Sequence, residues 1–395
     1  MIPDPAIASI ASVADWLIEG APTASGPEGI IEELCERVVA TGIPVWRAAM
    51  FVSTLHPEIM GRRIEWREGI GTAVGEAPYA VFNSPSFRGS PVAAVYRDRQ
   101  MLRVRLDEPS AGEYPQLDDL RAEGATDYLA VPILFTSGEV HVGVWATRQP
   151  GGFAEAQIAA LMTLTAPLAR LTEIYALRRT AANLLDAYVG RDAGARVLGG
   201  QVRRGFSEAI EAVIWLSDMR GFTALADTVA PAELVALLNR YFDCQVPVIL
   251  DHGGEVLKFM GDGLLAIFPL TGRDPEVVCA AAMQAAGEMR AAVAAMEGWP
   301  DAAETGAPRH GLALHIGELL YGNIGAAGRL DFTCIGPAVN LAARLEALAA
   351  RLGRTTLVSA AFARHCCAGL APLGEFALAG FRVPQPVYGL VDEAG

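Results

Sequence analysis

AVIWLSDMRGFTALAD, at residues 212–227, is an apolar run that stops at Asp218 and is followed by a tight turn and a helix. GGEVLKFMGDGLLAIFP, at residues 253–269, consists of two β-rich runs joined by Gly-Asp-Gly, the pattern of a β-hairpin with Asp262 at its tip. Each acid therefore lies where a buried strand ends, held on a rigid element and open to solvent. This is the geometry of a divalent-metal site that leaves room for phosphates. Taken alone, either acid could instead be a helix N-cap or a turn residue.

The rest of the C-terminal half alternates strands with helices. Its pattern predicts strands over about 211–217, 311–325 and 331–336, a hairpin over 254–268, and helices over about 222–228, 231–250, 275–297 and 338–353. This order predicts a ferredoxin-like βαββαβ core, the α/β sandwich layout that polymerase palms also use. We expect this domain to cover residues 206–395.

The N-terminal part begins with helices, continues with strands and ends with a helix. Helical spacing covers residues 6–20 and 29–42, each stopped by glycine, and a further helix begins at about residue 154. Strand-like runs lie between them, at residues 46–55, 62–69, 92–98, 101–108, 128–135 and 141–148. This order resembles the outline of GAF or PAS sensor domains, and more closely the GAF type. We therefore expect an α+β and α/β multidomain chain with a GAF-like α/β sensor over residues 1–160.

The ligand of such a sensor is not identified by any motif in this region. GIGTAVG, at residues 69–75, is one residue off the dinucleotide-binding fingerprint and lacks a βαβ context, so no nucleotide is expected there. Aromatic and arginine side chains could line a small-molecule pocket, or form core and solvated strand faces. They are Trp46, Trp66, Tyr79, Phe82, Arg103, Arg105, Tyr128 and Trp145.

A helical connector is expected over residues 161–205. Apolar residues at positions 164, 168, 171, 174, 177, 181, 184 and 188 are three or four apart, which predicts a coiled-coil seam. The alternative is a single helix packed on its own domain. A parallel dimer through this helix would bring two C-terminal domains together.

Length and charge limit the classes of protein that fit. A chain of 395 residues has room for two domains, and a net charge of −14 without a basic block argues against nucleic-acid binding. No apolar run approaches the roughly 18–20 residues of a membrane span, and the N-terminus lacks the pattern of a signal peptide. The six cysteines have no metal-binding spacing, so reduced thiols in a cytoplasmic protein are expected.

Three motifs follow one another in the C-terminal half: SDMRGFT, KFMGDG and DFTCIGPAVNLAARLE. In this order and spacing they strongly resemble the catalytic domain of class III nucleotidyl cyclases, over about residues 209–391. The resemblance implies that Asp218 and Asp262, with the carbonyl of Met219, hold two Mg²⁺ or Mn²⁺ ions that bind a triphosphate. It also implies that the turn after Arg220 donates backbone hydrogen bonds to phosphate oxygens, through Gly221, Phe222 and Thr223.

Base selection in this family depends on two side chains. Here they are Lys258, four residues before the second aspartate, and Thr333, seven residues before Asn340. A lysine donates to N1 of adenine, whereas a carboxylate at that position would favour the N1–H and amino group of guanine. The resemblance therefore implies an adenylyl cyclase. The Lys/Thr combination also resembles a subgroup whose members often respond to bicarbonate.

Asn340 and Arg344 are four residues apart on one predicted helix and should point to the same side. The resemblance implies that Asn340 contacts the ribose and that Arg344 stabilises charge on the transferring phosphoryl group. Arg329 is a further candidate phosphate contact, and we interpret Asp331 as structural. The plain alternatives are that Arg344 is a surface helix arginine and Lys258 a solvated strand end.

Catalytic sites of this family form between two chains, one providing the metal aspartates and the other the side chains for base, ribose and phosphoryl group. The resemblance thus implies a homodimer that converts ATP to 3′,5′-cyclic AMP and pyrophosphate under control of the N-terminal domain. The alternatives are guanylyl cyclase activity and a nucleotide-binding regulatory pseudo-cyclase. Lys258 disfavours the first. The second is disfavoured because both metal aspartates and the Asn/Arg pair are retained.

Overall fold

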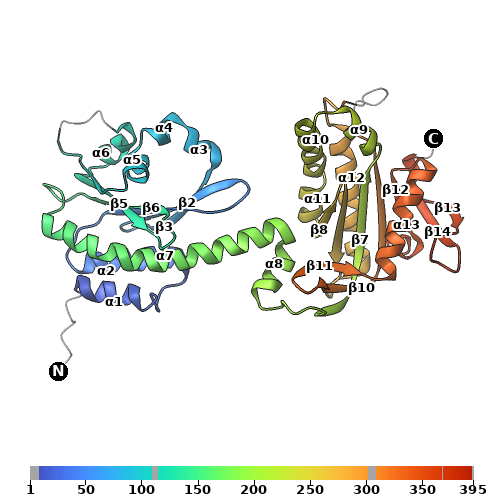
Figure 1. Cartoon of the computed structure of the whole chain (residues 1–395), viewed down its shortest axis with the longest axis horizontal. Coiled ribbons are helices and arrows are strands. Elements are labelled where there is room, and N and C mark those ends of the chain that lie inside the picture. Colours follow the sequence, from blue (N-terminus) through green and yellow to red (C-terminus); the bar gives the residue numbers. More distant parts are fainter. Residues whose placement is uncertain (1–8, 109–113, 301–307, 367, 394–395) are drawn as a thin grey trace. The chain divides into compact units, whose positions relative to one another are not determined.

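The computed structural model of the chain describes residues 9–108, 114–300, 308–366 and 368–393. It divides into two compact units, Met1–Ala187 and Tyr188–Gly395, each with its own sheet and core (Figure 1). Residues 6–8 of the first expected helix lie outside the described residues. Among the helices that the structure describes, none has the length and hydropathy needed to cross a membrane.

The N-terminal unit is built on a six-stranded antiparallel sheet in the order β3-β2-β1-β6-β5-β4. Its strands are β1 (Arg47–Ser53), β2 (Ile59–Arg67), β3 (Gly71–Pro78), β4 (Leu102–Arg105), β5 (Asp127–Leu134) and β6 (Val140–Thr147). One face is covered by α1 (Ile10–Ile18), α2 (Gly26–Ala40) and the first part of α7 (Glu155–Val189). The short helices α3 (Tyr79–Asn83), α4 (Pro85–Arg88), α5 (Pro91–Asp98) and α6 (Asp118–Ala122) belong to the other face, with the 3-10 turn η1 (Pro115–Leu117).

Two expectations for this unit are corrected by the structure. The run at residues 92–98, predicted as a strand, is helix α5. The Ser90 hydroxyl caps it by accepting a hydrogen bond from the backbone N–H of Ala93, and Pro91 occupies its first turn. Ser-Pro is a helix-start signal that outweighs the β-branched residues of the run. The glycine-rich segment at 69–75 is part of a turn and edge strand β3, which the sequence did not predict.

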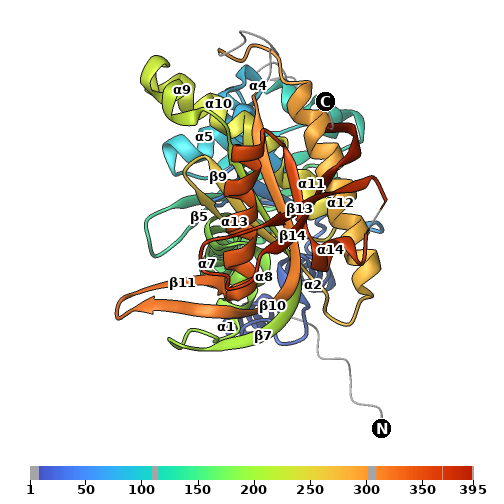
Figure 2. The ribbon, with the colours of Figure 1, turned by 90° about the vertical axis from the view of Figure 1, so that its right-hand side faces the viewer.

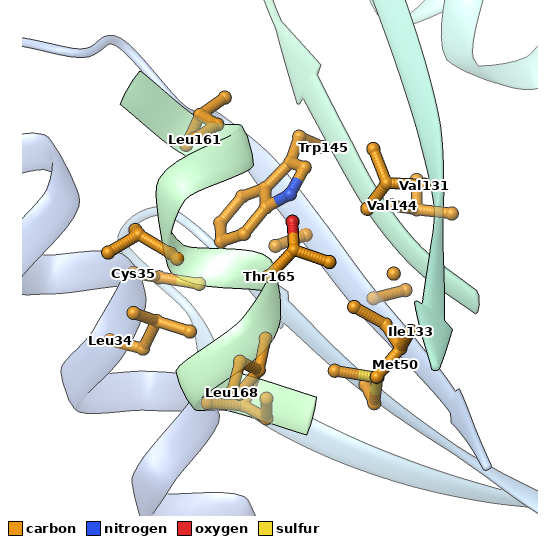
Figure 3. Close-up of a pocket in the computed structure, with 15 residues that line it drawn as sticks. Leu34, Cys35, Met50, Val131, Ile133, Val144, Trp145, Leu161, Thr165 and Leu168 are labelled. Atoms are coloured by element: carbon orange, nitrogen blue, oxygen red, sulfur yellow. The ribbon is translucent and has the colours of Figure 1, made fainter. Parts of the chain in front are cut away.

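Side chains from α2, α7 and the sheet point toward one another in the core, as Figure 3 shows for Leu34, Leu168, Met50 and Trp145. The space left among these side chains is about 10 Å³, no more than one water molecule needs. This face of the sheet therefore holds no ligand cavity at that place.

The two halves of the apolar stripe on α7 differ in their surroundings. Leu164, Leu168 and Leu171 are buried in the core of the N-terminal unit. Farther along, Ile174 and Leu177 are 54% and 64% exposed, so they pack against little of their own chain. The first half of the stripe thus stabilises the domain, and only the second half is open to another partner.

The C-terminal unit contains an eight-stranded sheet in the order β13-β14-β12-β10-β7-β9-β8, with β11 paired to β10. The long strands β7 and β10 and the neighbouring β11 can be followed in Figure 2. Its strands are β7 (Ser207–Met219), β8 (Glu255–Met260), β9 (Gly263–Pro269), β10 (His310–Ala326), β11 (Arg329–Ile335), β12 (Thr356–Ser359), β13 (Leu370–Phe376) and β14 (Gln385–Leu390). All pairings are antiparallel except β10 with β12. The expected strands and the hairpin are present, and β7 and β10 are longer than predicted.

The helices of this unit pack on both faces of the sheet. They are α8 (Arg191–Leu198), α9 (Phe222–Thr228), α10 (Pro231–Asp243), α11 (Val246–Asp251), α12 (Pro275–Ala294), α13 (Pro337–Leu352) and α14 (Ala360–Ala363), followed by η2 (Val391–Glu393). Helices α9 to α12 and α14 share a core with one face of β7, through Val213 and Trp215. Helix α13 packs against the other face, which presents Ala212 and Ile214.

The single helix predicted over 231–250 is wrong, because the segment forms two helices, α10 and α11, separated at Cys244 and Gln245. Pro247 lacks a backbone N–H and restricts the residue before it, so helix α10 cannot continue through this point. Proline instead occupies the first turn of α11, where a missing N–H costs nothing.

Candidate active site

The two predicted metal aspartates lie next to each other at one end of the sheet. Asp218 is the second-last residue of β7 and pairs with Gly311 of β10. Asp262 belongs to the two-residue turn of the β8–β9 hairpin, after Gly261 with its φ of +68°. A Cβ on Gly263 would lie 3.3 Å from Oδ1 of Asp218, so this glycine lets the hairpin tip approach the end of β7.

The surroundings of Asp218 carry an excess of negative charge, which a bound cation would neutralise. Burial, and then the negative charges of Asp262 and Glu346, raises the pKa of Asp218 to about 6, while Arg220 acts in the opposite direction. Two neighbouring carboxylates at a half-buried strand end fit a divalent cation. Within the described residues, no group of three or more His, Cys, Asp or Glu side chains could hold a metal. Further ligands would therefore come from backbone carbonyls, water or substrate.

An ion pair that the sequence did not reveal borders this acid pair. Nη2 of Arg220 lies 2.8 Å from Oε1 of Glu346 on α13 and donates to the Glu346 backbone carbonyl at 3.3 Å. The guanidinium passes over Gly311, where an added Cβ would come within 1.9 Å of Nη2. Glu346 ends the third motif and Gly311 is the second residue of β10, so the pair depends on contacts between segments far apart in sequence.

The turn that follows β7 has the conformation that its sequence predicts. Gly221 has a φ of +78° and precedes α9. Phe222 packs against the core of the unit, whereas Thr223 is exposed. The Met219 side chain is buried in that core, so only its backbone could contribute to a metal site.

The predicted base-selecting residues lie on neighbouring strands. A bulge at Leu257 interrupts the β8–β9 register, so that Val256 pairs with Ala266 and Lys258 with Leu265. The Lys258 ammonium lies 2.9 Å from a carboxylate oxygen of Asp331 on β11, in a largely exposed ion pair. Asp331 therefore has a definite partner, consistent with the structural role expected for it.

Thr333 follows two residues later on β11 and is 5% exposed. Its hydroxyl has no hydrogen-bond partner among the described residues. Buried hydroxyls are normally paired, so this oxygen is a candidate to receive a ligand group.

Asn340 and Arg344 lie one turn apart on α13, and both are exposed. Nε of Arg344 donates to the backbone carbonyl of Ala379 at 3.2 Å, and the Asn340 side chain has no hydrogen bond or ion pair with any described residue. Arg329 is exposed at the start of β11. These three residues thus make few contacts with their own chain.

Three groups emerge: the aspartates with Arg220 and Glu346, the pair Lys258 and Asp331 near Thr333, and the exposed residues of α13. No hydrogen bond or ion pair between described residues joins one group to another. The structure of one chain therefore assembles each group separately.

Residues 207–362 match the family described as adenylate and guanylate cyclase catalytic domain. These residues lie in the C-terminal unit, so the similarity to this family is a property of that unit. Among its relatives is an adenylate cyclase of Anabaena cylindrica, 32% identical over 154 residues, which cover 38% of this chain and 30% of the relative.

Adenylate cyclase 1 of Rhizobium meliloti is 29% identical over 188 residues, covering 46% of this chain and 27% of that protein. The chain thus spans less than a third of the length of these two curated relatives. Among solved structures, the adenylyl cyclase CyaB from P. aeruginosa is 26% identical with a TM-score of 0.40, covering 47% of this chain and 96% of that one.

Proposed function

We propose that this chain is an adenylyl cyclase that converts ATP to 3′,5′-cyclic AMP and pyrophosphate. The observation that supports it most directly is the pairing of an acid pair at a strand end with Lys258 and Thr333 on neighbouring strands. The order β10-β7-β9-β8 also supports the ferredoxin-like core expected for such a domain.

Asp218 and Asp262, with the backbone at Met219, would hold Mg²⁺ or Mn²⁺, most simply two ions. Bound divalent ions would lower the pKa of the ribose 3′-hydroxyl and neutralise phosphate charge. The chain's own contribution is to keep both carboxylates close together on rigid elements. The turn at Gly221, Phe222 and Thr223 would add backbone N–H donors for the phosphates.

Adenine and guanine differ in the hydrogen-bonding groups at N1 and the neighbouring ring substituent, and the chain would use this difference to select adenine. The Lys258 ammonium has three donors, so it could donate to adenine N1 while keeping its contact with Asp331. The Thr333 hydroxyl, which has no hydrogen-bond partner among the described residues, could accept a hydrogen bond from the adenine amino group. Guanine presents an N1–H donor at the same place, and a lysine cannot accept it.

The side chains for the ribose and the phosphoryl group, like Lys258 and Thr333 for the base, would come from a second copy of the chain. Asn340 would contact the ribose and Arg344 the transferring phosphoryl group, with Arg329 a further phosphate contact. Both α13 residues are exposed and have almost no partner in their own chain. These side chains would be used in a homodimer. Each site of such a dimer would take its aspartates from one chain and its other groups from the partner.

Turnover of ATP and GTP by the purified chain, with Mg²⁺ or Mn²⁺ and with or without bicarbonate, tests this proposal. Cyclic AMP from ATP alone is expected, and stimulation by bicarbonate would agree with the Lys/Thr subgroup. In Lys258→Glu the ratio of ATP to GTP turnover should fall at least tenfold, because the carboxylate now accepts from guanine. Preferential use of GTP by the unchanged chain would instead favour a guanylyl cyclase. Nucleotide binding without product under every condition would favour a pseudo-cyclase.

The shared site is tested by mixing two inactive variants. Asp262→Ala lacks a metal ligand and Arg344→Ala lacks the phosphoryl contact, so each homodimer should be inactive. A mixed dimer contains one site with both residues intact, and activity should return on mixing. Subunit exchange without any return of activity would contradict the shared site.

The N-terminal unit would control the geometry of that dimer. It contains a cavity of about 560 Å³ on the face opposite α7, with Arg47, Glu65 and Tyr128 in its wall. This is room for a small molecule, as expected for a GAF-like sensor. The exposed part of the α7 stripe at Ile174 and Leu177 would form the coiled-coil connector with its counterpart in a second chain.

Filling the cavity tests this control. Ser86 lines the cavity, and Ser86→Trp is expected to change cyclic AMP production at least twofold by occupying the ligand's place. Ser137→Trp, at an exposed turn of the same unit, serves as the control. Equal turnover in both variants and the unchanged chain would argue against a regulatory cavity.

A further inference from the structure

A second cavity, of about 480 Å³, lies in the C-terminal unit outside the groups described above, except that it includes the Arg220 side chain. Its wall is formed by the start of β10, the last turns of α12 and α13, and the segment that leads into β12. The polar side chains on it are predominantly basic: Arg220, Arg290, Arg309, His310 and Arg354.

The acidic side chains nearby balance only part of this charge. Arg290 donates to Asp392 at 2.6 Å and is also 3.8 Å from Glu393. The Glu393 carboxylate in turn accepts from the backbone and hydroxyl of Thr355. Arg220 has its ion pair with Glu346.

Arg309 and Arg354 have no ion pair or side-chain hydrogen bond with any described residue. Within the described part of the chain, two guanidinium groups on this wall are therefore without a counter-charge, in a protein that is acidic overall.

Two nitrogen atoms on the wall are buried without a hydrogen-bond partner among the described residues. One is Nε2 of His310, a residue that is only 5% exposed. The other is Nη1 of Arg354. A buried donor left unpaired costs about 1–3 kcal/mol, and more when it is charged, so such atoms usually mark a missing partner. Burial, and then the charges of Arg220 and Arg290, lowers the pKa of His310 to about 4, so its ring is neutral at pH 7.

Structural roles alone account for only part of this arrangement. The C-terminal ends of α12 and α13 contribute Ala294 and Gly353 to the wall, and helix C-termini favour nearby cations. That effect explains why arginines are tolerated here. It does not explain why Nη1 of Arg354 and Nε2 of His310 are buried without an acceptor among the described residues.

We propose that this cavity is a phosphoryl-anion site, in which Arg309 and Arg354 neutralise a phosphate group and His310 donates from Nε2. A tetrahedral oxyanion offers several acceptor oxygens at once, which suits donors converging from β10 and from the segment after α13. The size of the cavity admits inorganic phosphate or a diphosphate.

Binding of an anion in this cavity would affect the acid pair, Asp218 and Asp262, through Arg220. The backbone N–H of Arg220 donates to the carbonyl of Arg309 at 2.8 Å, so the wall of the cavity and the turn after Asp218 are directly linked. The Arg220 guanidinium, shared between Glu346 and the cavity, is the group that a bound anion would attract. An anion here would thus draw positive charge away from Asp218.

The test is isothermal titration calorimetry of the full chain with sodium phosphate and with sodium pyrophosphate, in EDTA and at constant ionic strength set with chloride. EDTA removes divalent ions, so anions bridged by a metal at Asp218 and Asp262 do not contribute. Binding of one phosphate or pyrophosphate per chain is expected. Arg354→Gln should weaken it about tenfold to a hundredfold, through loss of a charge-assisted hydrogen bond.

Arg309→Gln alters an exposed residue, so it tests the same site without risk to folding, and a loss of at least severalfold is expected. The matched control is Arg351→Gln, an exposed arginine of α13 that does not line the cavity, and it should bind like the unchanged chain. Absence of binding by both anions would overturn the proposal, as would equal weakening by Arg351→Gln. Because no turnover is measured, the result is independent of whether the chain is a cyclase.

Discussion

Replacing Asp218 by asparagine should inactivate the enzyme proposed here and stabilise its metal-free fold. The carboxylate is half-buried and lies beside Asp262 and Glu346, so its charge is unfavourable until a cation is bound. Asparagine keeps the shape of the side chain and removes the charge. The same substitution would therefore separate the requirements of the site from those of the fold.

The size of this effect follows from the pKa of Asp218. A rise from 3.8 to about 6 corresponds to roughly 3 kcal/mol, at about 1.4 kcal/mol per pH unit. Because the group is only partly buried, solvent screening reduces the expected gain to about 1–2 kcal/mol. The folded-state pKa lies above the unfolded value, so the penalty is absent well below about pH 4, grows as pH rises from about 4 to about 6 and is complete above about pH 7.

Hydrogen exchange measured on the β7 and β10 peptides of the full chain reports this local stability, without assuming that both units unfold together. In EDTA at pH 8, Asp218→Asn should slow exchange in these strands by about fivefold to thirtyfold relative to the unchanged chain. Adding Mn²⁺ should then protect the unchanged chain but not the variant. Asp243→Asn, which removes an exposed carboxylate from α10, should change neither measurement.

Faster exchange in Asp218→Asn at pH 8 would refute the reasoning, since it would mean that the charge stabilises the strand end. So would a gain of the same size at pH 8 and near pH 4, because a titrating carboxylate cannot produce it. Turnover at the rate of the unchanged chain would refute the metal assignment independently.

Three further substitutions probe neighbouring parts of the unit. Burial raises the pKa of Glu255 to about 7, so its charge is unfavourable in the folded chain at high pH. Glu255→Gln should therefore stabilise β8 by about 1–2 kcal/mol at pH 8 and by little below about pH 4.5. Equal hydrogen exchange in the variant and the unchanged chain at pH 8 would contradict this. Asp331→Asn removes the partner of Lys258 and should raise the KM for ATP up to about fivefold with kcat unchanged, whereas an unchanged KM would show that the lysine needs no positioning. Gly311→Ala places a Cβ 1.9 Å from Nη2 of Arg220 and 2.6 Å from Oε1 of Glu346, and it should destabilise β10 by about 1 kcal/mol. The loss should become smaller when Arg220→Met is added, and an unchanged loss in that background would place the cause elsewhere.

The hairpin that carries Asp262 could be predicted from sequence because its signals are local. Alternating strand patterns flank a two-residue Gly-Asp turn, and Gly261 has the positive φ that such a turn requires. The strand end at Asp218 and the helical placement of Asn340 and Arg344 were equally local. The sequence was therefore sufficient to predict the position of a residue where that position depends only on the strand, hairpin or helix that contains it.

Features that depend on distant segments were missed. The ion pair between Arg220 and Glu346 exists because β7, β10 and α13 meet over Gly311, and no local pattern encodes that meeting. The error at α5 had a different cause, since Val92 and Val95 favoured a strand while Ser90 provided a stronger cap. The apolar stripe of α7 was likewise ambiguous from periodicity alone, which cannot distinguish an intramolecular core from a dimer seam.

The distribution of the candidate site residues bears on how such an enzyme could be regulated. Asn340 and Arg344 are exposed on α13 and are held by little more than one contact to a backbone carbonyl, whereas the acid pair is fixed by two strands and a hairpin. If the site is completed by a second copy, chemistry requires that α13 of one chain reach the acid pair of the other. Activity would then depend on dimer geometry rather than on rearrangement inside a domain, and a small displacement transmitted by a connecting helix would be enough to remove it. Specific activity should accordingly fall on dilution below the dimer dissociation constant, which a monomer owning a complete site would not show.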